Sequence, residues 1–319
     1  MKILITGVLG LIGNNLSRAL LKRGYEVFGI DNSLIRKSKD LHPDVILYRF
    51  DVSDYFPFGY ISFPQKIDVI VHLAAGKIPL QPGEAEKFLY SNTKSTMNII
   101  AYAKRCNAKV IFASTGDIYG LQDEFSEESN SILGPPRIAR WSYAINKLWA
   151  EHAFHASDIR FNIIRYFGGY GPYQSLERIA APPQALFISQ IYNGRPITIH
   201  GDGLQTRAFC YIDDMVDGTI RVIEHADDRE TFNIGNPYEE VTIIDLATHI
   251  KALMGNGHLP LTLNTKPSPL EYQDILARKP NIEKARTLLG YEPKIDLTEG
   301  LLRTINWQVE EMKNGNKKE

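Results

Sequence analysis

The amino-terminal stretch constrains the fold more than any other, because a buried strand pattern leads directly into three glycines and then a helix. The β-branched run 2–6 is typical of a buried strand, and Gly7, Gly10 and Gly13 follow in the spacing G-x-x-G-x-x-G. The first glycine permits a tight turn, the second lets backbone approach a pyrophosphate, and the third lets helix and strand pack closely. The helix N-terminus then presents free N–H groups to the phosphates. The stretch therefore predicts a dinucleotide site, with a ligand-free glycine-rich turn as the alternative.

Strand and helix patterns alternate through the first half of the chain. Beyond 2–6 we expect strands at 26–30, 45–50, 67–73, 109–113 and 161–166, and a long helix at 85–106. Such alternation implies an α/β fold with a doubly wound parallel sheet, whose ligands bind outside the carboxyl ends of the strands. Later elements are shorter and richer in Pro and Gly. We therefore expect a Rossmann domain over 1–170, to which 203–240 returns a strand and a helix, and a mainly substrate-binding lobe over 171–319.

Polar and small residues follow several of these strands. Asp31 ends the second strand, where a carboxylate would accept hydrogen bonds from the ribose hydroxyls of NAD and repel the extra phosphate of NADP. Arg36 and Lys37 lie close enough in sequence to weaken this preference if their loop folds back. The other candidates at strand ends are Asp51 and Val52 against the adenine, Ala74 and Ala75 at a close backbone approach, and Ser114 and Thr115.

A tyrosine and a lysine lie four residues apart at the start of the next helix pattern. Tyr143 and Lys147 would share one helical face. A phenol loses its proton at about pH 10, and a neighbouring ammonium lowers that value, which yields a proton acceptor for neutral pH. The same spacing arises by chance in many proteins, with an exposed Tyr and a solvated Lys. Its convergence with the glycine loop and the strand ends favours the catalytic interpretation.

Composition excludes several other classes of protein. The 36 Lys and Arg nearly balance the 37 Asp and Glu, so there is no basic field of the kind that binds nucleic acid or an anionic membrane. No apolar run approaches the length of a membrane span, and the early strand pattern leaves no room for a signal peptide. Cys106 and Cys210 lack metal-site spacing, so we expect no metal and a reducing, cytoplasmic location.

Longer motifs extend these signals over essentially the whole chain. They are H-L-A-A at 72–75, S-T-G-D-I-Y-G at 114–120, R-Y-F-G-G-Y-G-P at 165–172, G-D-G-L-Q-T-R-A-F-C-Y-I-D-D at 201–214, and the closing stretches 278–282 and 289–293. Together with the glycine loop and the Tyr–Lys pair, they resemble the extended short-chain dehydrogenases/reductases that act on nucleotide sugars as epimerases, dehydratases and decarboxylases. The resemblance implies an NAD-dependent enzyme that transiently oxidises a nucleotide sugar at C4, with a UDP-sugar favoured as substrate.

The resemblance also assigns roles to individual residues. Tyr143 would accept the hydroxyl proton, Lys147 would lower its pKa and bind the nicotinamide ribose, and Thr115 would relay the proton. Asp117 would take part in a second chemical step. Cofactor contacts are implied for Gly7, Gly10, Leu11, Ile12, Gly13, Asp31, Asn32, Asp51, Val52, Leu73, Ala74, Ala75, Asn92, Ser114, Tyr143, Lys147 and Tyr166. Substrate contacts are implied for Lys77, Thr115, Gly116, Gly168, Arg207 and Arg278.

The motifs do not decide the second step. The approach to the catalytic Tyr at 136–142 and E-Y-Q-D at 271–274 resemble UDP-glucuronate decarboxylases, in which Arg278 would face the sugar carboxylate. However, Gly116 and Asp117 stand where decarboxylases carry Ser-Glu and dehydratases carry Asp-Glu.

A second departure, Gly168 in place of the usual Asn, bears on the same step. Gly116 and Gly168 would enlarge the site and let a 4-keto sugar turn over, so we expect 4-epimerisation first and UDP-glucuronate decarboxylation second. Dehydration, one-way 4-dehydrogenation and a non-catalytic NAD sensor are the remaining alternatives.

The family resemblance also predicts assembly. The helices expected at 85–106 and 142–155 are the pair that this family uses for a two-fold interface, which implies a homodimer. Their apolar residues are candidates for that interface, with core packing as the competing explanation: Phe88, Ile99, Tyr102, Trp149 and Phe154.

Overall fold

The computed structural model describes residues 1–33, 40–54, 66–76, 83–174, 182–264, 275 and 277–316. Within them, a parallel seven-stranded sheet has the order β11-β6-β5-β4-β1-β2-β3. The strands are β1 (Lys2–Thr6), β2 (Glu26–Ile30), β3 (Ile46–Tyr48), β4 (Val69–His72), β5 (Lys109–Thr115), β6 (Phe161–Tyr166) and β11 (Thr231–Ile234). This confirms the doubly wound α/β fold. The strand order reverses between β1 and β4, which marks the edge where such folds bind ligands.

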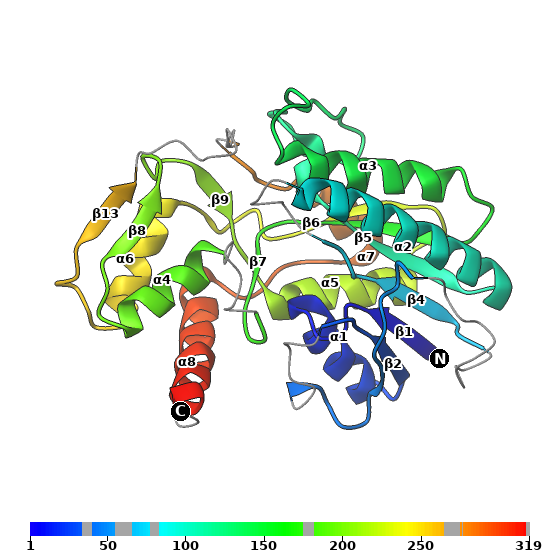
Figure 1. Ribbon diagram of the computed structural model, residues 1–319, viewed down its shortest axis with the longest axis horizontal. Coiled ribbons are helices and arrows are strands. Elements are labelled where there is room, and N and C mark those ends of the chain that lie inside the picture. Colours follow the sequence, from blue (N-terminus) through cyan, green and yellow to red (C-terminus); the bar gives the residue numbers. More distant parts are fainter. Residues whose placement is uncertain are drawn as a thin grey trace.

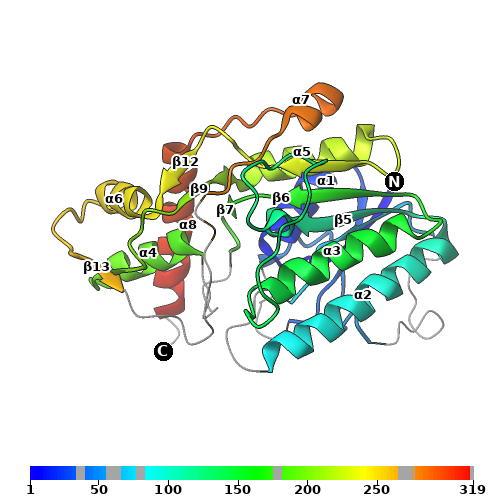
Figure 2. The same cartoon turned by 90° about the horizontal axis from the view of Figure 1, so that it is seen from above.

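Helices cover both faces of the sheet, as Figures 1 and 2 show. One face carries α1 (Leu11–Lys22), α5 (Ile212–His225) and α7 (Glu283–Leu289), and the other carries α2 (Glu84–Cys106) and α3 (Trp141–His155). Alternate strand residues serve the two cores: Ile3 and Ile5 pack on the side of α1, whereas Leu4 packs on the side of α2. Burial on both faces explains why the strands read as continuous apolar runs.

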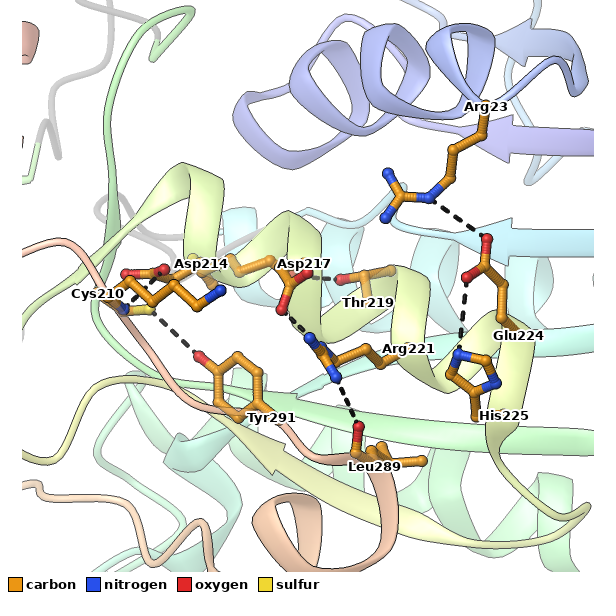
Figure 3. Close-up of polar contacts among 12 residues, drawn as sticks. Arg23, Cys210, Asp214, Asp217, Thr219, Arg221, Glu224, His225, Leu289 and Tyr291 are labelled. Atoms are coloured by element: carbon orange, nitrogen blue, oxygen red, sulfur yellow. Dashed lines mark hydrogen bonds and ion pairs between the residues drawn. The ribbon is translucent and has the colours of Figure 1, made fainter.

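Polar contacts fix α5 between the first helix and the carboxyl-terminal part of the chain (Figure 3). Glu224 forms an ion pair with Arg23, the residue after α1, with 3.4 Å between Oε1 and Nε. Arg221 pairs with Asp217 and donates to the carbonyl of Leu289, beyond which the chain passes back toward the sheet edge. These contacts tie the carboxyl-terminal segment to the face of the sheet that holds α1.

A smaller lobe lies at one end of the molecule (Figure 1). It contains α4 (Pro183–Tyr192), β8 (Ile197–His200), β9 (Thr206–Ala208), β12 (Glu240–Thr242), α6 (Ile243–Leu253), β13 (Leu261–Asn264) and α8 (Leu297–Asn316). Two short strands, β7 (Gly169–Tyr170) and β10 (Cys210–Tyr211), pair where the chain passes from the sheet into this lobe. The lobe thus lies beyond the carboxyl end of β6, next to the edge where ligands are expected.

Candidate active site

The glycine loop packs directly on the end of β4. Gly7 has φ +72°, and a Cβ placed there would lie 2.9 Å from the backbone nitrogen of Ala74. A Cβ on Gly13 would lie 2.4 Å from the carbonyl oxygen of Gly7. Helix α1 begins at Leu11, directly after Gly10. Because the first-turn N–H groups of a helix have no acceptor within it, this cradle suits a pyrophosphate.

The carboxylate of Asp31 sits 8% exposed beside this loop. Its two oxygens accept hydrogen bonds from the backbone nitrogens of Leu9 at 3.0 Å and Ser33 at 2.9 Å. Each oxygen retains further acceptor capacity, which ribose hydroxyls could use. Next to it, Asn32 donates to Asp51 at 2.6 Å. Arg36 and Lys37, which could alter cofactor preference, lie outside the described residues.

Two side chains organise the backbone that follows β4. The amide of Asn92 accepts from the nitrogen of Gly76 at 2.7 Å and donates to its carbonyl at 3.0 Å. Thr6 bonds His72 across the strand ends at 2.7 Å and accepts from the nitrogen of Ala74 at 3.2 Å. Asn92 therefore positions the loop that contains Leu73, Ala74 and Ala75. The backbone carbonyl of Val52 accepts from Asn98 at 2.8 Å, which holds the predicted adenine side in the same way.

Lys147 is 4% exposed, and α3 directs it onto the end of β5. Its ammonium donates to the carbonyl of Ala113 at 2.6 Å and lies 4.6 Å from the ring centre of Phe112. Burial, and then the charge of Lys147, lower the pKa of His72 to about 3, so that imidazole is neutral. Tyr143 lies one turn before Lys147 on α3 and is partly exposed. Lys147 therefore lies at the carboxyl end of β5, with Tyr143 one turn earlier on the same helix.

Asp117 lies in the short 3₁₀ helix η2 (Gly116–Tyr119), directly after β5. It accepts from Arg278 at 2.6 Å and from Arg140 at 3.2 Å, and the hydroxyl of Thr115 donates to it at 3.3 Å. Burial would raise the pKa of Asp117, but Arg278 and Arg140 outweigh it and hold the pKa below its usual range. The carboxyl group is thus ionised at neutral pH, and two cations converge beside Thr115.

Arg278 belongs to a segment that the small lobe holds in place. Arg207 donates to the carbonyl of Ile275 at 2.8 Å, and the nitrogen of Ala208 donates to the carbonyl of Arg278 at 3.3 Å. The buried Nε of Arg278 has no partner among the described residues, which leaves a donor for a ligand. The structure therefore brings Thr115, Asp117 and Arg278 together with Arg207 nearby, whereas Lys77 and the stretch 271–274 lie outside the described residues.

The expectation that two glycines enlarge the site is wrong. A Cβ on Gly116 would lie 2.5 Å from the ring of Phe167, which already fills that space. Gly168 has φ +53°, and a Cβ there would lie 1.8 Å from the carbonyl oxygen of Ala208. Both glycines therefore allow close packing of neighbouring groups, and neither opens room for a turning sugar.

Some features of the site had no clear signal in the sequence. Arg140 is 4% exposed, and its pairing with Asp117 depends on the course of the loop before α3. The one signal in the sequence is its position three residues before Tyr143. Tyr166 was expected at the cofactor, and its hydroxyl bonds Thr219 of α5 at 2.7 Å. Its phenol is therefore committed to the face of the sheet that carries α5.

Comparison with known proteins identifies the family. Residues 3–235 match the model of the NAD-dependent epimerase/dehydratase family. The chain belongs to this family. It is 32% identical to a UDP-N-acetyl-α-D-glucosaminuronate decarboxylase of Bacillus cytotoxicus, covering 95% of this chain and 96% of that one. It is 34% identical to UDP-glucuronic acid decarboxylase 5 of Arabidopsis thaliana, covering 94% and 87%.

Solved structures of the family show the same architecture. UDP-glucuronic acid 4-epimerase from Bacillus cereus, in complex with UDP-glucuronic acid and NAD, is 29% identical with a TM-score of 0.84, covering 98% of this chain and 100% of that one. The protein is thus an NAD-dependent member of a family of nucleotide-sugar epimerases and decarboxylases. The glycine cradle and the acceptor oxygens of Asp31 fit NAD. Within the described residues, no cluster of His, Cys, Asp or Glu could hold a metal. None of the helices in that part of the chain combines the length and the hydropathy of a membrane span.

Proposed function

We propose that this enzyme decarboxylates a UDP-linked uronic acid, with UDP-glucuronate as the first candidate. The observation that carries the proposal is the convergence of Arg140 and Arg278 on Asp117, beside the hydroxyl of Thr115. Two cations at the sugar end of a buried site suit a substrate carboxylate, since guanidinium groups bind carboxylates in a bidentate manner. The similarity to two decarboxylases over nearly the full chain supports the same choice.

The first half of the reaction needs a base at the C4 hydroxyl. Tyr143 accepts the hydroxyl proton as a phenolate, and the ammonium of Lys147 favours that ionised form. Thr115 donates a hydrogen bond that orients the reacting oxygen. NAD, when bound, supplies the hydride acceptor at C4. The glycine loop and Asp31 hold it, and the lobe that carries Arg207 binds the nucleotide diphosphate.

The second half uses the charged cluster. A ketone at C4 places the C5 carboxylate β to a carbonyl, so the bond from C5 to the carboxyl carbon can break and leave its electron pair as a C4–C5 enolate. Arg278 and Arg140 orient the carboxylate before it leaves as carbon dioxide. A proton from solvent would then add to C5, and Tyr143 would return its proton to the C4 oxygen as C4 regains hydride. Asp117 is ionised, so its role is to position the two arginines rather than to donate a proton.

The second candidate is 4-epimerisation of the same UDP-uronic acid. The structural likeness to the B. cereus 4-epimerase favours it, because the same oxidised intermediate can accept hydride on its other face. Gly116 and Gly168 give it no support, because neighbouring groups already fill the space around both glycines.

Incubation of the purified protein with UDP-glucuronate, UDP-N-acetylglucosaminuronate and their neutral UDP-hexose counterparts tests the proposal. We expect a product that has lost carbon dioxide from the uronates alone. An isomer of unchanged mass would establish the epimerase, and loss of water would establish a dehydratase. Stoichiometric accumulation of reduced cofactor would instead identify a one-way dehydrogenase.

We also propose a homodimer formed by α2 and α3. Of the residues expected there, Ile99, Tyr102 and Phe154 are buried in the core, so they are excluded from the interface. The large exposed apolar side chains on these two helices are Leu89, Tyr90, Met97, Ile145 and Trp149. Light scattering at micromolar concentration is expected to show a dimer, and Met97→Lys with Trp149→Lys should yield the monomer. A monomeric wild type would refute the assembly.

A further inference from the structure

A second buried charge lies on α3, one turn beyond Lys147. Glu151 is 4% exposed and shares the helical face of Tyr143 and Lys147. Its carboxylate accepts from Arg165 at 2.8 Å and 3.2 Å, and the hydroxyl of Ser114 also donates to it. Nothing in the chemistry described above uses this ion pair.

The position of the pair in the sheet gives it a mechanical role. Ser114 of β5 and Arg165 of β6 are paired across the two strands, so both reach Glu151 from one face of the sheet. Lys147 meanwhile bonds the carbonyl of Ala113, the residue before Ser114. Helix α3 is therefore attached at two successive residues of β5, immediately before Thr115.

The hydrogen bonds continue from Arg165 toward the substrate end. Arg165 donates to the hydroxyl of Tyr119 at 2.8 Å, and Tyr119 donates to Asn233 at 2.8 Å. The amide of Asn233 donates to the carbonyl of Asn281 at 3.0 Å, three residues beyond Arg278. Tyr119 ends the same 3₁₀ helix that contains Asp117. We call Ser114, Glu151, Arg165, Tyr119 and Asn233 the Glu151 network.

We infer that the Glu151 network positions the proton-accepting pair of α3 relative to the substrate-binding cluster. It joins the helix of Tyr143 and Lys147 to the segment of Asp117 through the charge-assisted bonds of Glu151 and Arg165. Neutral bonds of Tyr119 and Asn233 continue it to the segment of Arg278. Glu151 and Arg165 are thus positioning residues that act through Tyr143 and Lys147. The inference rests on the proposed roles of that pair, and it applies to C4 oxidation whichever second step follows.

If the Glu151–Arg165 ion pair only stabilised the fold, replacing both residues by apolar ones would leave turnover unchanged. Replacing a buried ion pair with apolar residues of similar volume is often neutral or stabilising, so Glu151→Leu combined with Arg165→Met should preserve the fold. It cannot restore the bonds to Ser114 and Tyr119. A displacement of about 1 Å in a catalytic group can cost about 10²-fold in rate.

The test compares this double variant with wild type on the nucleotide sugar that wild type turns over. We expect kcat to fall by about 10²-fold, with KM and NAD affinity within about threefold and a thermal midpoint close to wild type. Single-turnover reduction of NAD, followed by absorbance, should fall in parallel with kcat. A folded double variant with near wild-type kcat would overturn the inference.

Two further variants complete the design. Asp228→Asn weakens the ion pair of Lys109 at the opposite end of β5, and it should leave kcat unchanged. Ser114→Ala keeps the Glu151–Arg165 pair and decides the case in which the double variant does not fold. An approximately tenfold loss of kcat with unchanged NAD affinity supports the inference, since bonds to charged groups are strong. Wild-type kcat, or a loss of kcat that a loss of NAD affinity accounts for, overturns it. A wild type inactive on every nucleotide sugar would instead refute the proposed function.

Discussion

The proposed cofactor end and the proposed substrate end of the active site are formed by different kinds of groups. At the cofactor end, backbone N–H groups, glycines and one carboxylate form the site, and Asp31 and Gly7 lie close together in the sequence. At the substrate end, Asp117 is held by Arg140 and by Arg278 from the far end of the chain. The first arrangement suits a ligand through its shape and its backbone N–H dipoles. The second suits a charged ligand through the guanidinium groups of two arginines. Variation in the substrate end can therefore change the reaction without disturbing the cofactor end.

The largest expected effect is on the chemical step and not on ligand binding at either end of the site. Tyr143→Phe removes the proton acceptor and preserves the ring, so turnover should fall by about 10²–10⁴-fold, the usual contribution of positioned acid–base catalysis. NAD binding and the thermal midpoint should stay close to wild type, because the variant keeps the ring of Tyr143 and leaves the glycine loop and Asp31 unchanged. Tyr238→Phe, at an exposed tyrosine between β11 and β12, is the matched control. Near wild-type turnover in the Tyr143 variant would remove this residue from the mechanism.

The charged end should contribute to stability in a pH-dependent way. The pKa of Asp117 is lowered in the folded protein, so its contribution is present above about pH 4 and is lost as pH falls through the lower folded pKa. Asp117→Asn leaves two buried guanidinium groups without their carboxylate, which should cost about 3 kcal/mol of unfolding free energy at neutral pH.

Denaturant unfolding of both proteins between about pH 3 and pH 7 measures this difference. The gap between wild type and Asp117→Asn should widen as pH rises. A gap that stays constant with pH would show that Asp117 is not a stabilising carboxylate.

The cofactor end should discriminate through a single carboxylate. Repulsion between Asp31 and the extra phosphate should make NADP bind about tenfold or more weakly than NAD, about 1.4 kcal/mol. Asp31→Asn should bring the dissociation constants of NADP and NAD, measured by calorimetry, closer together. Equal or tighter binding of NADP by wild type would refute the preference for NAD.

The difference between the two ends also explains what the sequence could predict. The glycine loop and the strands were readable because local pattern and spacing determine them, and β1, β2 and β6 have the predicted bounds. The pairing of Asp117 with Arg278 could not be predicted, because it depends on how two segments far apart in the sequence meet in the fold. The prediction that Gly116 and Gly168 open space failed for the same reason, because the contacts that Phe167 and Ala208 make with them arise only in the folded chain.

The most direct test of the account measures how the charged end reads the substrate. UDP-glucuronate and UDP-glucose differ by one carboxylate, so their dissociation constants, measured with NAD present, isolate its recognition. For Arg278→Met we expect UDP-glucuronate to bind about 10²-fold more weakly while UDP-glucose stays within about threefold, because a charged partner is lost for one ligand alone. Arg286→Met, at a partly exposed arginine of α7, should change neither dissociation constant. An equal loss for both sugars, or no loss for either, would contradict the assignment of Arg278 to the sugar carboxylate.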